Sequence, residues 1–300
     1  MQLNFIKHRI IYLIFFGILM AGSVFSVLYF GLKPGIDFTG GSILEIDFEA
    51  RPENQIIQEK LKDLNLGDIV VQPTGEKGVI IRMKEIDENT HQEIISKLGE
   101  LSKVEEKRFE SVGPVIGKEL KQKTIILIIF SLIALLIYIA ISFRKVTWPV
   151  SGFQYGIISI VTLAFDVSIP IGILTILGKF YNVQFNIPIV TALLTILGYT
   201  INDKVIVFDR VRENIFRIKH DNFENLLNQS LNQILTRSLS TGSCTLFVLF
   251  AIFFLGGETL RYFSLTLIIG IIVGTLTSLF LAPSLLLGWL NLSRRKTSSR

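Results

Sequence analysis

Long apolar runs dominate the chain, and short polar segments separate most of them. Six runs approach or exceed the roughly 20 residues that a helix needs to cross a bilayer. They lie at residues 10–30, 124–143, 154–177, 187–208, 237–255 and 262–287. The pattern predicts a polytopic α-helical membrane protein with six transmembrane helices.

One polar segment, residues 31–121, is much longer than the others and carries shorter patterns. Alternating apolar residues predict strands, and apolar residues three or four apart predict amphipathic helices. The expected order is strand 40–48, helix 53–64, strands 68–73 and 78–83, helix 89–101 and strand 104–112. This β-α-β-β-α-β order is typical of a small α+β ferredoxin-like domain. A helix is expected to continue from it into the second span through "GKELKQKTIILIIF".

Composition supports the membrane interpretation. Half of the residues are hydrophobic and 18% are charged, and the mean hydropathy is +0.53. The formal net charge of +5 does not point to nucleic acid, because lysines and arginines gather beside the apolar runs. The single cysteine, Cys244, excludes a disulfide within the chain.

Positive charge also predicts the orientation. Basic clusters at 7–9, 143–145, 209–220 and 294–296 fall on one side if the chain has six spans. Cytoplasmic segments are rich in lysine and arginine, so both termini are expected in the cytoplasm. The expected organisation is a first span within 1–30, retained rather than cleaved as a signal peptide, an extracytoplasmic (periplasmic-side) domain at 31–121, five further spans within 122–290 and a basic tail at 291–300.

Asp203 lies within the fourth predicted span, where a charge costs at least about 2.5–3.5 kcal/mol on insertion scales. It is expected about 6–9 Å inside the cytoplasmic end of the helix. Lys204 points about 100° away, and its long side chain is expected to reach the membrane surface. Asp203 is too short for that and needs a cation, a proton or water.

Arg237 opens the predicted fifth span on the same side of the membrane. An ion pair with Asp203 would keep the aspartate charged, and separation of the pair would favour proton uptake. Two interpretations remain open. The pair is a proton-operated switch, or Arg237 is an interfacial anchor and Asp203 a polar residue near a helix end.

Asp166 lies near the middle of the third predicted span, in "LAFDVSIPIG". The hydroxyl-rich sequence "RSLSTGSCT" of the fifth span is a candidate hydrogen-bonding partner, since small polar residues let helices approach closely. A structural hydrogen bond and a place in an ion path both remain open for Asp166.

Three motifs together resemble the SecF proteins of the SecD/SecF protein-export family, within the resistance-nodulation-division superfamily. They are "GIDFTGG" after the first span, "GYTINDKVIVFDRVREN" at the end of the fourth, and "LNQILTRSLSTGSCTLFVLFAIFFLGGETLRYFSLTLIIGIIVGT" through the last two. The resemblance covers essentially the whole chain. It implies a SecD partner, association with the SecYEG channel, indirect cooperation with SecA, and a preprotein substrate in a bacterial inner membrane.

The resemblance also implies roles for particular residues. The aspartate of the family's "ND" pair corresponds to Asp203, and its arginine at the start of the fifth span corresponds to Arg237. Coupling to the proton-motive force is therefore expected there, with Asp166 as a third ion-coupling residue. Phe165 stands where family members often have histidine, and this difference puts a proton relay through the third span in doubt. Sodium remains the alternative coupling ion. Supporting polar residues are expected at Thr200, Asn202 and Ser240.

The motif "GIDFTGG" is interpreted as a structural corner between the first span and the first strand. Gly40 and Gly41 allow backbone angles that other residues resist, and Asp37 and Thr39 are expected to bind the local backbone. An anion-binding nest is the alternative. His91 is expected to be a solvated residue on an exposed helix face.

The expected function is an accessory subunit of protein export that couples ion flow to movement of the external domain. We expect no enzymatic activity, no cofactor, no metal and no nucleic-acid partner. Membrane lipid is expected as a partner. A half-transporter of the same superfamily, exporting a lipid or small molecule, is the alternative. An intramembrane hydrolase using Asp166 and Asp203 needs the carboxylates close together, and their predicted depths differ by about half a membrane.

Overall fold

The computed structural model describes residues 4–143, 151–217 and 222–298. The chain forms two compact units. Residues 33–126 and 184–187 make one, here called the α+β domain, and residues 1–32, 127–183 and 188–300 make the other, here called the helical bundle. The basic clusters expected at 143–145 and 209–220 fall partly outside the described residues.

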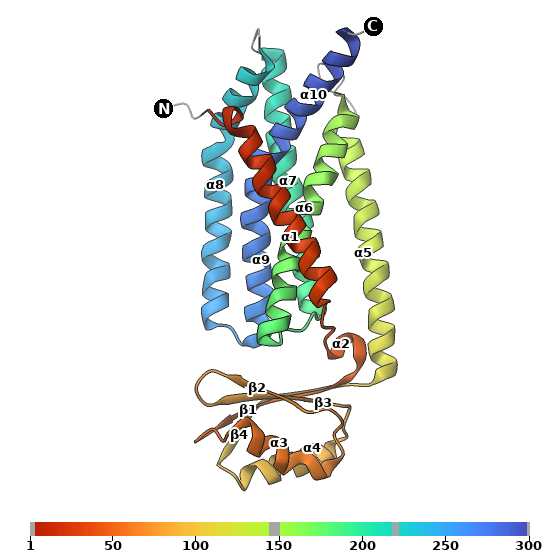
Figure 1. The fold of residues 1–300 in the computed structure, drawn as a ribbon, viewed down its shortest axis with the longest axis vertical. Coiled ribbons are helices and arrows are strands. Elements are labelled where there is room, and N and C mark those ends of the chain that lie inside the picture. The colour runs from red at the N-terminus through yellow and green to blue at the C-terminus, as the bar shows by residue number, and fades with distance from the viewer. Residues whose placement is uncertain (1–3, 144–150, 218–221, 299–300) are drawn as a thin grey trace. The chain divides into compact units, whose positions relative to one another are not determined.

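The α+β domain has the predicted order of elements. A one-turn helix α2 (Ile36–Thr39) precedes β1 (Gly41–Phe48), α3 (Asn54–Leu61), β2 (Val70–Thr74), β3 (Gly78–Met83), α4 (Glu88–Gly99) and β4 (Val104–Val112), with a 3-10 turn η2 (Lys62–Leu64) after α3. The strands form one sheet in the order β2-β3-β1-β4, and every adjacent pair is antiparallel. Both longer helices cover one face of the sheet (Figure 1). The ferredoxin-like prediction is confirmed.

The core of this domain follows the alternation that predicted β1. Leu44, Ile46 and Phe48 of β1 are buried against apolar residues of α3, β3 and α4. Because strand residues two apart share one face, these positions fix the register of β1 against its neighbours. A bulge at Glu45 and Ile46 shifts that register along β4.

The prediction that His91 is solvated is wrong. Its side chain is 4% exposed, and its ring stacks on Phe109 at 3.8 Å between centroids. Nδ1 lies 3.2 Å from a carboxylate oxygen of Glu88, and Nε2 lies 3.3 Å from one of Glu106. The helical pattern placed His91 on a polar face, but β4 covers that face with an aromatic ring.

The helical bundle contains the predicted long helices. They are α1 (Arg9–Phe30), α5 (Pro114–Phe143), α6 (Gly152–Tyr181), α7 (Ile187–Arg217), α8 (Phe223–Leu255), and α9 (Glu258–Leu276) continued through a π-helical turn η3 (Thr277–Leu281) into α10 (Ala282–Ser298), with a 3-10 turn η1 (Ile6–His8) before α1. Six helices in the described residues are long and apolar enough to cross a membrane. The predicted helix from the external segment into the second span is present as α5, whose first part belongs to the α+β domain.

Two helices extend well beyond the predicted spans. α8 begins at Phe223, where Asn222 caps it by accepting a hydrogen bond from the Glu224 amide at 3.0 Å. α7 continues to Arg217 through a charged segment in which Glu213 pairs with Arg210 and Arg217. Hydropathy marks only the apolar part of such helices. These extensions place Arg237 inside α8 and Asp203 near the middle of α7.

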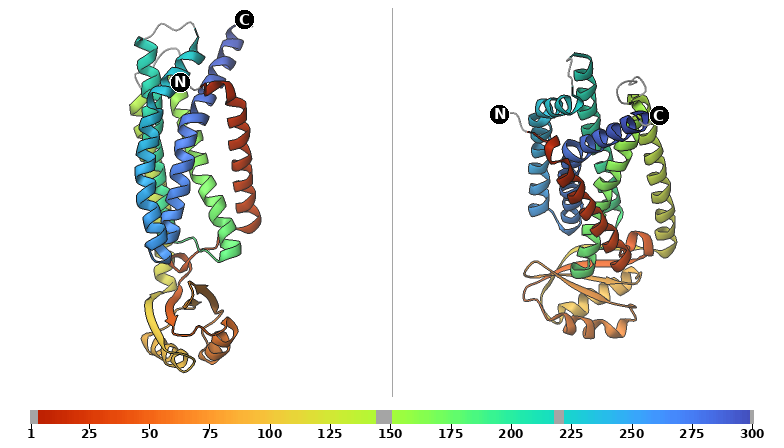
Figure 2. Two further views of the ribbon diagram at one scale, coloured as in Figure 1. Left: turned by 90° about the vertical axis from the view of Figure 1, so that its left-hand side faces the viewer. Right: turned by 45° about the horizontal axis from the view of Figure 1, so that its top comes forward.

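Helix packing in the bundle relies on small residues. α1 packs along α6 and α8 along α9 (Figure 2). Gly172 of α6 lies so close to Ser23 that an added Cβ would be 2.5 Å from the Ser23 Cα, and the Ser26 hydroxyl donates to the Gly172 carbonyl at 2.8 Å. Small residues permit this approach of two backbones, as is common between membrane helices.

Candidate functional site

A buried polar cluster lies where α6, α7 and the α9–η3 segment meet. Asp166 of α6 and Lys204 of α7 are both 0% exposed, and Asp203 of α7 is 4% exposed. The neighbouring hydroxyls come from Thr275 of α9 and Thr277 of η3. Charged groups in an apolar bundle need compensation, so the cluster is the candidate functional site.

Both carboxylate oxygens of Asp166 have partners. Lys204 Nζ donates to Asp166 Oδ2 in a fully buried ion pair. Thr277 Oγ1 lies 2.5 Å from Asp166 Oδ1, and Lys204 Nζ lies 3.5 Å from the same hydroxyl. Asp166 thus has a cation on one carboxylate oxygen and a hydroxyl on the other.

The π-helical turn η3 begins at this cluster. Thr277 is its first residue, and the hydroxyls of Thr277 and Ser278 lie 3.0 and 2.7 Å from the Gly274 carbonyl. Single π-turns inside α-helices are often found at functional sites. Here the hydroxyls of Thr277 and Ser278 donate to the Gly274 carbonyl. The same turn places the Thr277 hydroxyl next to Asp166.

Gly274 sets the close approach of α9 to α7. An added Cβ there would lie 2.0 Å from Thr200 Cγ2 and 3.7 Å from Asp166 Cγ. One turn earlier, an added Cβ on Gly270 would lie 2.1 Å from Ile196 Cδ1. Glycines four residues apart form a smooth helix face against which a second helix packs closely, which brings α7 and its two charges against the α9–η3 segment.

Asp203 has a different environment from Asp166. Thr275 Oγ1 donates to Asp203 Oδ2 at 3.5 Å, a long hydrogen bond. No ion pair joins Asp203 to a cation within the described ranges. The Oγ1 of Thr200, one turn earlier on the same helix face, is buried without a hydrogen-bond partner. Asp203 is therefore a buried carboxylate whose one described hydrogen bond is long.

The other predicted site residues lie on exposed faces. Arg237 and Ser240 are exposed on α8, and Asn202 is exposed on α7. The structure thus brings Thr200, Asp203 and Asp166 into or beside the cluster but does not pair Asp203 with Arg237. The expected Asp203–Arg237 ion pair is absent from the described part of the chain.

Three further geometric expectations are wrong. Lys204 does not reach the membrane surface, because its ammonium turns inward to Asp166. Asp166 pairs with α7 and η3 rather than with the hydroxyls of the fifth span. The carboxylates of Asp166 and Asp203 do not differ in depth by half a membrane, since they contact hydroxyls only two residues apart in sequence. Asp166 is bound to the ammonium of Lys204 and not to Asp203, which differs from the paired carboxylates of an aspartate dyad.

A second polar arrangement lies within the α+β domain, at the corner "GIDFTGG". Gly40 and Gly41 have φ of 76° and 132°, and the Thr39 hydroxyl lies 3.1 Å from the Gly35 carbonyl. Asp37 does not bind the local backbone as expected; its Oδ2 accepts a hydrogen bond from the amide of Ile187 at 2.8 Å. Ile187 is the first residue of α7, so the carboxylate occupies the position of a helix cap.

Residues 184–187 are tied to the corner by more than Asp37. Gly35 N–H donates to the Phe185 carbonyl at 2.8 Å, and Phe185 N–H donates to the Lys33 carbonyl at 2.7 Å. The Phe185 ring lies 6.4 Å from that of Phe38. The segment that leads into α7 is thus part of the same compact unit as the four-stranded sheet.

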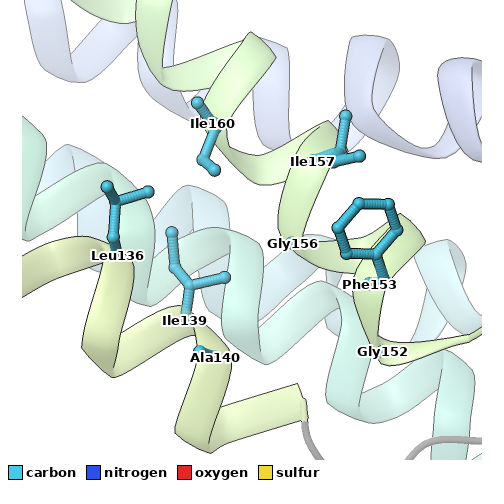
Figure 3. Close-up of a pocket in the computed structure, with 8 residues that line it drawn as sticks. All are labelled: Leu136, Ile139, Ala140, Gly152, Phe153, Gly156, Ile157 and Ile160. Carbon is cyan, nitrogen blue, oxygen red and sulfur yellow. The ribbon is translucent and has the colours of Figure 1, made fainter.

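An apolar groove of about 430 Å³ lies between α5 and α6, away from these polar residues. Figure 3 shows its lining, which consists of aliphatic side chains, glycines and Phe153. The residues that line the groove contribute no polar side chain. No group of three or more potential metal ligands occurs in the part of the chain that the structure describes.

The fold and the site define a class: a six-helix membrane protein with a ferredoxin-like domain after its first helix and buried charges in its bundle. The family model "Protein export membrane protein SecD/SecF, C-terminal" matches residues 91–292, and "SecD/SecF GG Motif" matches residues 25–50. The chain belongs to the SecD/SecF family.

Individual relatives agree with this assignment. The protein translocase subunit SecF of Thermobaculum terrenum is 38% identical over 295 residues, covering 93% of this chain and 91% of the relative. The SecF subunit of Anaerolinea thermophila is 36% identical over 265 residues, covering 87% and 85%. These relatives support a role in protein translocation.

A solved structure has the same fold. The crystal structure of SecDF from Thermus thermophilus, described as a translocon-associated membrane protein, is similar with a TM-score of 0.85 at 31% identity. The match covers 97% of this chain and 39% of that longer chain. The resemblance expected from the motifs is confirmed.

Proposed function

We propose that the chain is an accessory subunit of Sec-dependent protein export that couples ion flow to movement of its external domain. It works with a SecD partner in a bacterial inner membrane, beside the SecYEG channel and after SecA has acted on the preprotein. The proton is the proposed coupling ion, with sodium as the variant to test. No covalent bond of the preprotein changes in this scheme.

The observation that carries the proposal is the position of Asp203. It is buried near the middle of α7, its nearest described partner is a hydroxyl at 3.5 Å, and it lacks a cation within the described residues. A carboxylate in such a place must take up a proton or a cation to remain there. Uptake and release of that ion change the charge of the bundle, which is the requirement for an ion-driven machine.

The coupling to the external domain is proposed to run along α7. Asp37 of the corner caps the first turn of this helix, and Asp203 lies on the same helix. A long helix transmits displacement because its backbone hydrogen bonds make it stiff. A shift of α7 on protonation of Asp203 would be transmitted to residues 184–187 and from there to the corner.

Arg237 is proposed as the returning counter-charge. In this conformation it is exposed on α8 and does not pair with Asp203. The scheme needs two arrangements, one in which Asp203 carries the ion and one in which Arg237 approaches the ionised carboxylate. A difference in contacts between two states is what lets an ion drive a conformational change.

A polar exposed face supports the SecD partnership. Thr191, Thr195, Gly198 and Asn202 lie on the exposed face of α7. Arg237, Ser240, Thr241 and Cys244 repeat along the exposed face of α8. Such a face is unsuited to hydrocarbon and fits a protein partner or a water-filled path. The solved SecDF chain is much longer than this one, which agrees with a partner that supplies the remaining segments.

The orientation is proposed from the helix ends. In the bundle, α1 begins at the end where α5 ends, α6 begins, α7 ends, α8 begins and α10 ends (Figure 1). Lys7 and Arg9 lie at the start of α1, and Arg210, Arg212 and Arg217 lie in the last part of α7. This basic end is assigned to the cytoplasm, with membrane lipid around the apolar helices.

Export into inverted membrane vesicles tests the function. Vesicles carry the chain with its partner, and a proton or a sodium gradient is imposed in turn. The expected result is a gain in export with one ion that is lost in Asp203→Asn while the complex stays assembled. The matched control is Asp209→Asn, an exposed aspartate of the same helix that pairs with Arg212. Equal gains in wild type and Asp203→Asn would contradict ion coupling at this residue.

A further inference from the structure

The ammonium of Lys204 is an unusual feature of this bundle. Among the described residues, it is the single lysine or arginine that is buried. Its partner Asp166 is equally buried, and the two groups come from different helices. Lysine near a membrane surface normally extends its amine to water. An amine turned inward instead indicates that the interior contains a negative charge that it compensates.

We propose that Lys204 is the built-in counter-cation of Asp166 and that it thereby confines ion exchange in this chain to Asp203. The inference rests on the proposed function, because it names which carboxylate of the cluster exchanges the coupling ion. Lys204 is a positioning residue in this scheme, since it acts through Asp166 and does not carry the ion.

The balance of charge leads to this assignment. The cluster contains two carboxylates and one ammonium, all buried. With Asp166 and Lys204 both ionised, their charges cancel, and the cluster is neutral when Asp203 binds one proton or one monovalent cation. An ionised Asp203 leaves one excess negative charge, which low-dielectric surroundings penalise. The cluster is therefore built to exchange one ion for each copy of the chain.

The geometry separates the two carboxylates in the same way. Asp166 has Lys204 on one oxygen and Thr277 on the other, so an incoming ion would have to displace a cation tethered to the backbone. Asp203 has only the long hydrogen bond from Thr275 among its described contacts. Consecutive residues of a helix point about 100° apart. Lys204 can therefore face Asp166 while Asp203, the residue before it, faces Thr275.

The titratable groups around the cluster are few. Asp166 faces Lys204 from α6, and Asp203 is its neighbour on α7. The α9–η3 segment contributes the neutral hydroxyls of Thr275 and Thr277. Further titratable residues of the neighbouring helix segments are Arg237, on the exposed face of α8, and Tyr199, on α7. Among these groups, Asp203 is the acid left free to exchange a proton.

Infrared difference spectroscopy tests the assignment on membranes that contain the full chain and its partner, in sodium-free buffer. Acidification of the wild type should produce a protonated-carboxyl band that is lost in Asp203→Asn. The band should persist in the double variant Asp166→Asn/Lys204→Met. In Lys204→Met alone a second band should appear, because Asp166 without its cation takes up a proton. Loss of the wild-type band in the double variant, or no second band in Lys204→Met, would overturn the proposal.

Gradient-driven export gives the functional readout. Lys204→Met should lower it about tenfold or more, since breaking a buried pair destabilises the site and Asp166 without its cation competes with Asp203 for the coupling ion. Asp166→Asn/Lys204→Met removes both charges and should restore export to near the wild-type level. A double variant that is present in the membrane at normal amounts but inactive would assign Asp166 or Lys204 to the ion path itself.

Failure of the proposed function is distinguishable from failure of this inference. If wild-type export does not respond to a gradient, ion coupling fails, while the infrared bands still report which carboxylate Lys204 neutralises. If export responds and depends on Asp203 but the double variant stays inactive, ion coupling stands and the role given to Lys204 fails. Lys204→Arg is a further check, because a cation retained at this position should keep the second band absent.

Discussion

The carboxylate of Asp37 accepts a hydrogen bond from the backbone amide of Ile187, 150 residues further along the chain. The contact joins the corner after the first span to the first residue of the helix that carries Asp203. An unpaired amide in the first turn of a helix is a common target for an acidic side chain, because the helix dipole favours negative charge there. The family's glycine-rich motif thus holds an acid where it caps a distant helix.

Asp37→Ala is expected to weaken this connection. Loss of a helix-capping side chain costs about 0.5–2 kcal/mol, so the full chain should still fold and assemble. Gradient-driven export should fall, because residues 184–187 lose one of their ties to the corner. The measurement is export at a fixed amount of assembled complex. Asp68→Ala, which removes an exposed acid of the same domain, should have no effect, and an equal loss in both variants would contradict the prediction.

Gly40→Ala tests the corner itself. The residue has φ of 76° and ψ of 165°, and an added Cβ would lie 2.8 Å from the Pro114 Cα at the start of α5. This backbone region is essentially restricted to glycine and costs another residue about 1–3 kcal/mol, and the overlap adds about 1–3 kcal/mol. Gly75→Ala is the matched control, because Gly75 has φ of 57° but no neighbour within 4 Å. Thermal unfolding of the full chain should show a clearly larger loss for Gly40→Ala; equal losses would mean that only the backbone angle matters.

Much of the α+β domain was predictable because its patterns are local. The alternation in residues 40–48 and the helical spacing in 89–101 depend on neighbours a few positions away, and both elements formed. His91 was misplaced for the opposite reason. The ring that covers it belongs to Phe109 of another strand, and periodicity within one helix does not report which element packs on it.

The site was predictable in its residues but not in its pairing. Charge in an apolar run marks Asp166 and Asp203, since such charges need a reason. The pairing depends on the rotation of three helices, and two facts invisible to hydropathy set it: the glycines that bring α9 against α7, and the π-turn that presents Thr277. The sequence did contain one local indication of the Asp166–Lys204 pair. A lysine inside a membrane span has about the same insertion cost as an aspartate, so Lys204 also needed a partner.

Gly274→Ala examines the close approach of α9 and α7. The added methyl would overlap Thr200, whose Cγ2 lies 2.0 Å from the Cβ position. Overpacking of this kind costs about 1–3 kcal/mol, and relief of the overlap would move α9 away from the helix that carries Asp203 and Lys204. Gly22→Ala is the control, because this helical glycine of α1 has nothing within 4 Å and alanine favours helix. Export and thermal stability should both fall for Gly274→Ala only.

Asp87 gives the α+β domain a predictable pH dependence. Its side chain caps α4 and accepts hydrogen bonds from the Thr90 hydroxyl and amide at 2.6 and 3.0 Å. These bonds lower the pKa of Asp87 from its ordinary value of 3.8. A lowered folded-state pKa means that the stabilisation is present above pH 3.8 and is lost as pH falls through the folded-state pKa.

Asp87→Asn separates the cap from its charge. Asparagine caps helices about as well as aspartate but does not titrate. Protection of the first α4 amides from hydrogen exchange, corrected for intrinsic rates, should weaken in the wild type when pH is lowered past 3.8 and should stay constant in Asp87→Asn. The same decline in both proteins would assign the pH dependence to another group.

A double-mutant cycle tests whether Arg237 and Asp203 act as one unit although they are apart in this conformation. Arg237→Gln and Asp203→Asn should each abolish gradient-driven export, and the combination should be no worse than either alone, because residues that act together are non-additive. Arg237→Lys should be impaired as well, since an ammonium does not reproduce the planar fork of guanidinium. The control cycle uses Asp209→Asn and Arg212→Gln, an exposed pair at 2.5 Å, which should leave export unchanged. Partial, additive losses in the first cycle would mean that Arg237 serves the partner-facing surface of α8 and not the charge of Asp203.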